Sequence, residues 1–389
     1  MDDLTRDEGY RDKAPRRRPL RRLLVFLLIL VAVLAVVVLA AYRDGTGFDV
    51  LQRYFSYGGG EEDGAVSFTY DAASNNRYAP VGDGLAVLSG TEFQILDGKG
   101  RQVWSASVSM ENPALAAGGG RAAAYDVGGT ELYVADASGQ LLHLTADKAE
   151  PYIAVTLNHQ GWMAVTAEKK GYKGCVTVYN DKLSQVFEFH SGKRFVTDGY
   201  VTDDCKSLAA VTLGQSSSVF VSDVVLYDLD SKEPKADYEV RDGLVLDITQ
   251  KGDRIVTLSD TGLSFGTTGG KAEETYGFGG AYLRDYSLDG EGCSVLLLNR
   301  YQSGSVGRLV TVDDEGKELA SLDVREQVLS VSAAGRYVAV LYGDKLTIYN
   351  QELQEYAALT GTDYAKKVLM RQDGSALLLA SESARLFLP

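Results

Sequence analysis

The feature that most constrains this chain is a turn followed by a short apolar stretch, which recurs eight times. The intervals between successive turns are 36, 41, 44, 47, 38, 45 and 39 residues. Periods of about 40–45 residues with four strands each are typical of β-propeller blades. We therefore expect an all-β, eight-bladed propeller; seven blades is the alternative if one repeat is in a false register. The turns are placed at Gly84, Gly120, Gly161, Cys205, Gly252, Gly290, Gly335 and Gly374.

Each repeat also carries further strands after the first apolar run. Sequences such as LAVLS and WMAVTAE follow the turns, and alternating segments such as EFQILD and CVTVYN come next. Period-two alternation of apolar and polar residues is the pattern of a half-buried strand. A third segment, such as QLLHLT or KELASLDV, reads as the outermost strand of the blade. The last repeat ends at Pro389 without such a strand, and residues 65–71 (AVSFTYD) are expected to complete it.

The N-terminal part has a different character. From Leu23 to Ala41 the chain has 19 residues without a charge, Pro or Gly, directly after the basic string RRRPLRR. That length is close to the ~20 residues that cross a bilayer, and flanking positive charge favours the cytoplasmic side. The sequence thus predicts a cytoplasmic basic tail (1–22), one transmembrane helix (23–42) and an extracellular C-terminal domain. A cleaved signal peptide is the alternative, but the apolar run exceeds the 7–15 residues usual there.

Residues 43–64 read as a juxtamembrane stalk and linker, because Gly58, Gly59 and Gly60 precede the acidic run at 61–63. The predicted propeller then occupies residues 65–389. Several segments resemble a bacterial family catalogued as domain of unknown function 5711: the residues 112–134 (NPALAAGGGRAAAYDVGGTELYV), 168–180 (EKKGYKGCVTVYN) and 189–204 (FHSGKRFVTDGYVTDD). The resemblance implies a membrane-anchored propeller in a Gram-positive bacterium and carries no activity. More loosely, LDGKGRQVW (96–104) is similar to repeats of WD40- and quinoprotein-like propellers, where the Trp packs between blades.

Charge and composition exclude some functions. The chain has a formal net charge of −14, and removing residues 1–22 leaves 31 basic and 48 acidic residues, a net charge of −17. Such a surface repels phosphates, so no nucleic-acid partner is expected. The three His residues are not spaced as a metal motif, and no GxSxG or Cys/His cluster exists, so we expect no metal and no cofactor. The spacing of Cys175 and Cys205 leaves a disulfide open, although three free thiols is the simpler expectation.

Two groups of side chains are candidate binding residues. Five cations and one tyrosine should meet on the outward face, where loops of the third and fourth blades lie side by side: Lys169, Lys170, Tyr172, Lys173, Lys193 and Arg194. Against an acidic background they suit an anionic polymer or an acidic envelope protein. Loops of the fifth and sixth blades contribute the second group, aromatic and Arg side chains that suit sugar or protein contacts: Tyr276, Phe278, Tyr282, Arg300 and Tyr301.

The function expected from these observations is a non-catalytic binding or scaffolding module of the bacterial cell envelope, with the membrane contacted through one helix. An envelope polysaccharide-processing enzyme, which needs two carboxylates facing one cavity, is an alternative. A sensor that signals through the helix is another.

Overall fold

The computed structural model describes residues 19–43, 49, 53, 67–71, 73, 75–216, 218–240 and 243–389. The tail before residue 19 and nearly all of the expected stalk lie outside these ranges. The chain forms two compact units, residues 1–52 and 53–389. In the first, α1 (Pro19–Arg43) is one continuous helix of 25 residues, and Pro is well suited to its first turn. Within the described ranges, no helix is both long and apolar enough to cross a membrane.

The second unit is an eight-bladed β-propeller built from eight four-stranded antiparallel sheets. Blades 1 to 4 follow one another along the chain. Blade 1 consists of β2 (Arg77–Val81), β3 (Gly84–Leu88), β4 (Glu92–Leu96) and β5 (Gln102–Ser107), and blade 2 of β6 (Pro113–Gly118), β7 (Arg121–Asp126), β8 (Glu131–Asp136) and β9 (Gly139–Thr145). Blade 3 consists of β10 (Tyr152–Leu157), β11 (Met163–Ala167), β12 (Cys175–Tyr179) and β13 (Gln185–His190), and blade 4 of β14 (Phe195–Val201), β15 (Ser207–Ser216), β16 (Val219–Asp228) and β17 (Pro234–Val240).

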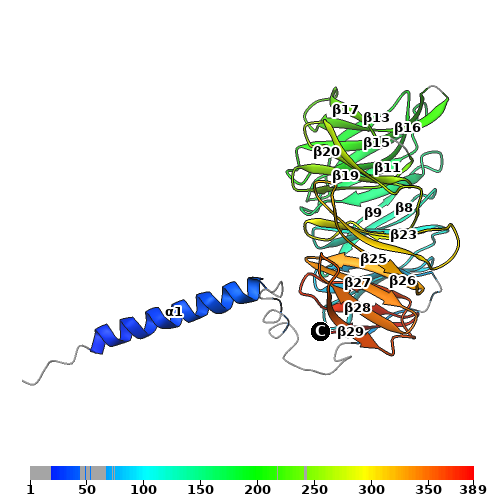
Figure 1. Ribbon diagram of the computed structural model, residues 1–389. Coiled ribbons are helices and arrows are strands. Elements are labelled where there is room, and N and C mark those ends of the chain that lie inside the picture. The colour runs from blue at the N-terminus through cyan, green and yellow to red at the C-terminus, as the bar shows by residue number, and fades with distance from the viewer. Residues whose placement is uncertain are drawn as a thin grey trace, which may run out of the picture. The chain divides into compact units, whose positions relative to one another are not determined.

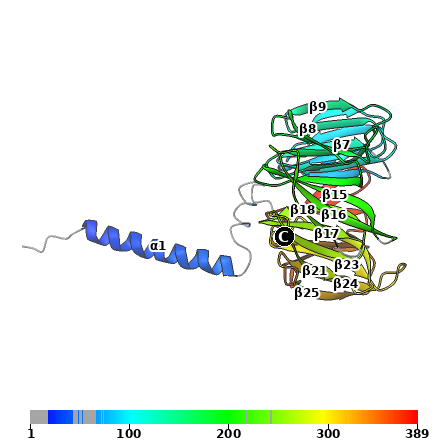
Figure 2. The same cartoon turned by 90° about the horizontal axis from the view of Figure 1, so that it is seen from above.

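Blade 5 consists of β18 (Val245–Lys251), β19 (Arg254–Ser259), β20 (Gly262–Thr267) and β21 (Ala272–Gly277), and blade 6 of β22 (Tyr282–Ser287), β23 (Cys293–Asn299), β24 (Gly307–Asp313) and β25 (Glu318–Val324). Blade 7 consists of β26 (Val328–Ala334), β27 (Tyr337–Tyr342), β28 (Lys345–Tyr349) and β29 (Glu355–Thr360). Blade 8 completes the ring with β30 (Lys367–Met370), β31 (Ala376–Leu379) and β32 (Ser383–Phe387), and takes its fourth strand, β1 (Ser67–Thr69), from the start of the unit. In Figure 1, the green strands β15–β17 of blade 4 and the orange strands β27–β29 of blade 7 lie at opposite ends of the propeller. In Figure 2, β7–β9 of blade 2 and β23–β25 of blade 6 lie on opposite sides of it.

Strand composition explains the position of each strand in its blade. The second strands, such as β3, β23 and β27, are buried along their whole length because both faces pack on neighbouring blades. The fourth strands, such as β9 and β25, instead alternate half-buried and exposed side chains over most of their length. The core therefore lies between blades. Phe93 and Trp104 of blade 1, whose rings pack edge to face at 5.3 Å between centroids, belong to one cluster with Ala122 and Ala124 of blade 2. The expected eight blades are confirmed.

Strand β1 closes the ring in the way expected for residues 65–71. It pairs antiparallel with β32, with Phe68 opposite Ala384, and the Phe68 side chain is fully buried. The Tyr70 hydroxyl contacts the carbonyl oxygens of Ala380 and Ser383 at 2.9 and 2.7 Å. The last blade thus joins the two ends of the propeller, and the free edge of β32 is covered.

Two faces of the ring are distinguished below. The turns between first and second strands form the inner-turn face. The loops that connect blades, together with the loops between second and third strands, form the crossover face.

Every inner turn has a residue in the left-handed backbone region, and the turn of blade 2 has two, because Gly119 also has a φ of +56°. In seven blades it is a glycine, with φ between +53° and +83°: Gly82, Gly120, Gly161, Gly252, Gly292, Gly335 and Gly374. The sequence analysis placed two of these turns at Gly84 and Gly290. Each lies two residues from the left-handed glycine of its turn, Gly82 and Gly292. In blade 4 the residue is Cys205, with φ +58°. A side chain in this region costs roughly 1 kcal/mol relative to glycine.

Arg53 lies on the inner-turn face and belongs to the propeller unit. Its guanidinium donates to the Asp373 carbonyl oxygen at 2.7 Å and to the Tyr356 hydroxyl at 3.0 Å. Asp373 is in the inner turn of blade 8, and Tyr356 begins the outer strand of blade 7. Only 6% of Arg53 is exposed. Its two hydrogen bonds therefore connect a buried point upstream of β1 to blades 7 and 8.

Candidate functional site

The basic group expected on the outward face is assembled on the crossover face. The Lys173 amide donates to the Ser191 carbonyl at 2.7 Å, so the loop between β11 and β12 lies beside the loop that enters blade 4. The Tyr172 ring packs on His190 at 4.7 Å between centroids, and the Lys173 ammonium lies over the Phe195 ring at 4.7 Å. The sequence prediction that these two loops are neighbours is therefore confirmed.

Two of its cations are neutralised by acids of the same blades. Lys169 pairs with Glu150 at 3.0 Å. Arg194 pairs with Asp223 at 3.1 Å and also donates to the Thr212 hydroxyl. The ammonium groups of three other residues have no acid partner in the described part of the chain: Lys170, Lys173 and Lys193. The group is therefore less basic than the sequence indicates.

Exposed apolar side chains of blade 4 lie on its first strand, beside Lys173, and on a long hairpin. Strands β15 and β16 have ten residues each, whereas most other strands have five to seven. Near the hairpin tip, Val219 and Phe220 are 64% and 68% exposed, and Phe195 on the first strand is 53% exposed. Phe195 is opposite Leu213, and Leu213 is opposite Ser222, two residues from Phe220, so both phenylalanines project from the same face of the sheet. We call Tyr172, Lys173, Lys193, Phe195 and Phe220 the blade-4 patch; Val219, next to Phe220 in β16, projects from the opposite face of the sheet.

The second expected group is brought together only in part. Tyr276, Phe278 and Arg300 line one cleft of about 830 Å³ between blades 5 and 6. Tyr282 and Tyr301 lie outside it, 48% and 60% exposed, although Arg300 stacks over the Tyr301 ring at 5.9 Å. Four charged residues that the sequence prediction missed also line the cleft: Arg308, Glu318, Asp323 and Arg325. We call this site the arginine cleft.

A third candidate, which the sequence prediction did not include, is the central channel. Asp198, Asp247 and Asp285 sit on the first strands of three consecutive blades, each at a β-bulge. A bulge redirects a side chain, and each carboxylate accepts the N–H of the following residue at 2.7–3.0 Å. The first strand is the inner edge of its sheet, so the bond satisfies an otherwise unpaired donor.

Two of these three carboxylates accept a further hydrogen bond, each from a different neighbouring blade. Asp285 also accepts the Val331 amide of blade 7 at 2.8 Å, and Asp247 accepts the Tyr286 hydroxyl of blade 6 at 3.1 Å. Burial, followed by repulsion from Asp247, raises the pKa of Asp198 to about 8. Burial raises the pKa of Asp247 to about 6, although the bond from Tyr286 lowers it. Beside them a cavity of about 410 Å³ is also lined by Arg284 and Lys367.

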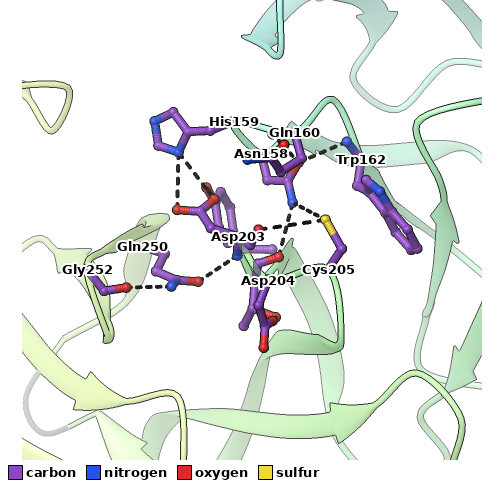
Figure 3. Close-up of polar contacts among 11 residues, drawn as sticks. Asn158, His159, Gln160, Trp162, Asp203, Asp204, Cys205, Gln250 and Gly252 are labelled. Carbon is purple, nitrogen blue, oxygen red and sulfur yellow. Dashed lines mark hydrogen bonds and ion pairs between the residues drawn. The ribbon is translucent and has the colours of Figure 1, made fainter.

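On the inner-turn face, a polar network links blades 3, 4 and 5 (Figure 3). The Asn158 side chain accepts the amides of Gln160 and Trp162 and donates to the Thr202 carbonyl at 3.1 Å. The Asp203 amide donates to the Gln250 side chain at 2.9 Å, and Gln250 in turn donates to the Gly252 carbonyl. These bonds join three successive inner turns, which is a structural role.

The same network contains His159, Asp203 and Cys205. The His159 Nδ1 lies 3.2 Å from both Asp203 oxygens, and this bond raises the pKa of His159. The Cys205 thiol contacts the Asn158 amide group at 3.6 Å and the Asp203 carbonyl at 3.8 Å rather than the imidazole. Burial raises the pKa of Cys205, the opposite of the shift that activates a nucleophilic cysteine.

The other cysteines and histidines are also held by neighbours. Cys175 and Cys293 are buried, and all three cysteines are free thiols, so the disulfide left open above is absent. His143 pairs with Glu131 at 2.7 Å, and His190 with Glu188 at 2.9 Å. Among the described residues, no group of three or more His, Cys, Asp or Glu is arranged to hold a metal ion.

Solved structures of low sequence identity share this fold. The C-terminal WD40 domain of Sif2 has a TM-score of 0.58 at 13% identity, covering 83% of this chain and 99% of that one. BamB from Moraxella catarrhalis has a TM-score of 0.51 at 11% identity, covering 82% and 99%. The quinohemoprotein alcohol dehydrogenase ADHIIG from Pseudomonas putida HK5 has a TM-score of 0.53 at 10% identity, covering 83% and 72%. These likenesses show the fold alone.

Sequence comparison gives one further result. Residues 63–384 match the model of a family of unknown function, DUF5711. No curated protein matches the chain.

Proposed function

The chain belongs to the DUF5711 family, and from that premise we propose that it is a membrane-anchored, extracytoplasmic propeller that scaffolds a protein partner in the bacterial cell envelope. The single observation that carries the scaffolding role is the blade-4 patch. It combines three exposed aromatic side chains, Tyr172, Phe195 and Phe220, with lysines that have no acid partner in the described residues. Exposed aromatic side chains with adjacent charge are typical of protein-binding surfaces.

Charge complementarity favours an acidic partner segment that carries apolar side chains. Lys173 and Lys193 would face its carboxylates, while Phe195 and Phe220 would pack on its apolar residues. Pairs of this kind raise the association rate and set the partner's orientation, whereas the buried aromatic side chains contribute most of the affinity.

Membrane anchoring rests on the sequence of residues 23–41, which has no charged residue and follows a basic string. The test is a protease added to intact cells, together with carbonate extraction of their membranes. We expect the propeller to be digested from outside and the N-terminal segment to stay in the membrane pellet. Release of the whole protein by carbonate would contradict the anchor.

The docking site is tested with a photo-crosslinking amino acid at position 172 in cells that naturally contain the protein. The control probe replaces Lys206, which is exposed on the inner-turn face. We expect a protein adduct from position 172 alone, which is lost in the double variant F195S/F220S and weakened by K173E/K193E. Equal labelling from both positions, or none, would contradict the proposal, and a polysaccharide adduct would replace the protein partner with an envelope polymer.

A polysaccharide-processing enzyme is the second candidate, favoured by one observation. Asp198 and Asp247 share the channel and have different raised pKa values, about 8 and about 6, as an acid and base pair requires. Hydrolysis of an envelope polysaccharide that both D198N and D247N abolish would favour this function over the scaffold.

A further inference from the structure

The arginine cleft is a second site, separate from the blade-4 patch. Its residues come from the end of β21 and the loop after it, from β23, and from β24, β25 and their flanking loops. Its volume of about 830 Å³ is within the range of small-ligand clefts, roughly 300–1,000 Å³.

Hydrogen bonds hold one wall of the cleft in place before any ligand arrives. One Glu318 oxygen accepts the Tyr276 hydroxyl at 2.6 Å and the Arg308 guanidinium at 2.9 Å. Burial disfavours ionisation of Glu318, but bonds from Tyr276, Ser321 and Arg308 outweigh it and hold its pKa below the usual value. Glu318 is therefore an ionised carboxylate that is already engaged by two donors.

The other two guanidinium groups are not neutralised in this way. Arg300 and Arg325 are exposed and line the cleft, and within the described residues neither forms an ion pair. Three arginines against Glu318 and Asp323 leave the cleft with one net positive charge, in a chain of net charge −14. An unpaired guanidinium is suited to bind a carboxylate or phosphate through two parallel hydrogen bonds.

The rim of the cleft is open. Gly277 and Gly279 line it, and an added Cβ at either position would meet no atom within 4 Å. An extended ligand can therefore lie across this edge, against the Tyr276 ring. We infer that the arginine cleft binds an anionic saccharide chain, with Arg300 and Arg325 on its acidic groups and Tyr276 against a sugar ring. This site is independent of the protein partner proposed above.

The test is calorimetric titration of the full chain in mild detergent with three probes: oligogalacturonate, a phosphorylated mannan oligosaccharide and neutral maltoheptaose. We expect binding of at least one anionic probe, which identifies whether carboxylate or phosphate is the acidic group, and no binding of maltoheptaose. R300E and R325E should each weaken binding about tenfold or more. The matched control R101E reverses an arginine charge on blade 1, where the side chain is 74% exposed, and should leave binding unchanged.

A blocking variant separates loss of charge from loss of the site. Gly277 is not in the left-handed region and has open space around it, so G277F should fill the cleft while the propeller stays folded. We expect G277F to abolish binding without lowering the unfolding temperature. Equal binding of the neutral probe, no binding of either anionic probe, or an equal loss in R101E would overturn the inference.

Discussion

At the scale of single residues, the inner turns show how one backbone requirement repeats around the ring. Seven blades meet it with glycine and blade 4 with Cys205. The repeat in the sequence located Cys205 as a turn residue, because the intervals on either side fit the period. It could not reveal the left-handed backbone, because only a glycine signals that conformation directly.

The variant C205G should therefore stabilise the protein. Glycine adopts this conformation without strain, so we expect the free energy of unfolding to rise by about 0.5–1 kcal/mol in urea titrations. The matched change in blade 5, G252A, should lower it by about 1 kcal/mol, because the added methyl group meets no neighbour and only the backbone cost remains. A loss of stability in C205G would show that the thiol contacts outweigh the strain.

The channel carboxylates predict a pH dependence. The pKa of Asp198 is raised from 3.8 to about 8 in the folded protein, so between these two pH values the folded protein keeps a proton that the unfolded chain releases. Stability should then fall as pH rises from about 4 to about 8, and change little further. Asp247, with a pKa of about 6, contributes in the same direction.

The variant D198N removes most of this dependence, since an amide oxygen can still accept the Gly199 amide. Urea unfolding at pH 8 should show D198N more stable than the native protein by about 1–3 kcal/mol, with no difference near pH 4. A change of equal size at both pH values would mean that Asp198 affects stability through its hydrogen bond alone.

At the scale of elements, the closing strand depends on very little chain. β1 has three residues, and Phe68 is its one fully buried side chain. The variant F68A should lower the free energy of unfolding by about 3–5 kcal/mol. Val103 on the outer strand of blade 1 is 42% exposed, so V103A should change it by less than about 0.5 kcal/mol. Similar effects of the two changes in denaturant titrations would contradict the closing role.

Blades could be predicted from the sequence because each strand type has its own pattern of burial, repeated eight times. The candidate sites were harder to predict. Asp223 of β16 neutralises Arg194, which comes just before β14. A single bulge residue directs the Asp198 side chain into the channel. Strand alternation predicts neither feature. Aligning the repeats reveals one missed signal: Asp198, Asp247 and Asp285 occupy equivalent positions on successive first strands.

At the scale of the whole molecule, ring closure makes the propeller depend on both ends of its sequence. A shortened chain starting at residue 44 should remain monomeric and unfold in one cooperative transition. One starting at residue 72 lacks β1, leaves the edge of β32 unpaired and should aggregate in size-exclusion chromatography. A chain starting at residue 65 keeps β1 without Arg53 and should remain monomeric. Monomeric behaviour of the chain from residue 72 would contradict the need for closure.

Arg53 has a consequence when the chain is under tension. A pull applied upstream of residue 53 reaches this buried guanidinium, bonded to Asp373 and Tyr356, before it reaches β1. Two blades then share the load, and the short closing strand is not peeled from β32 one hydrogen bond at a time. Arg53 thus protects β1 from a force applied to the upstream chain. The variant R53A should lower the force at which the ring opens in single-molecule stretching.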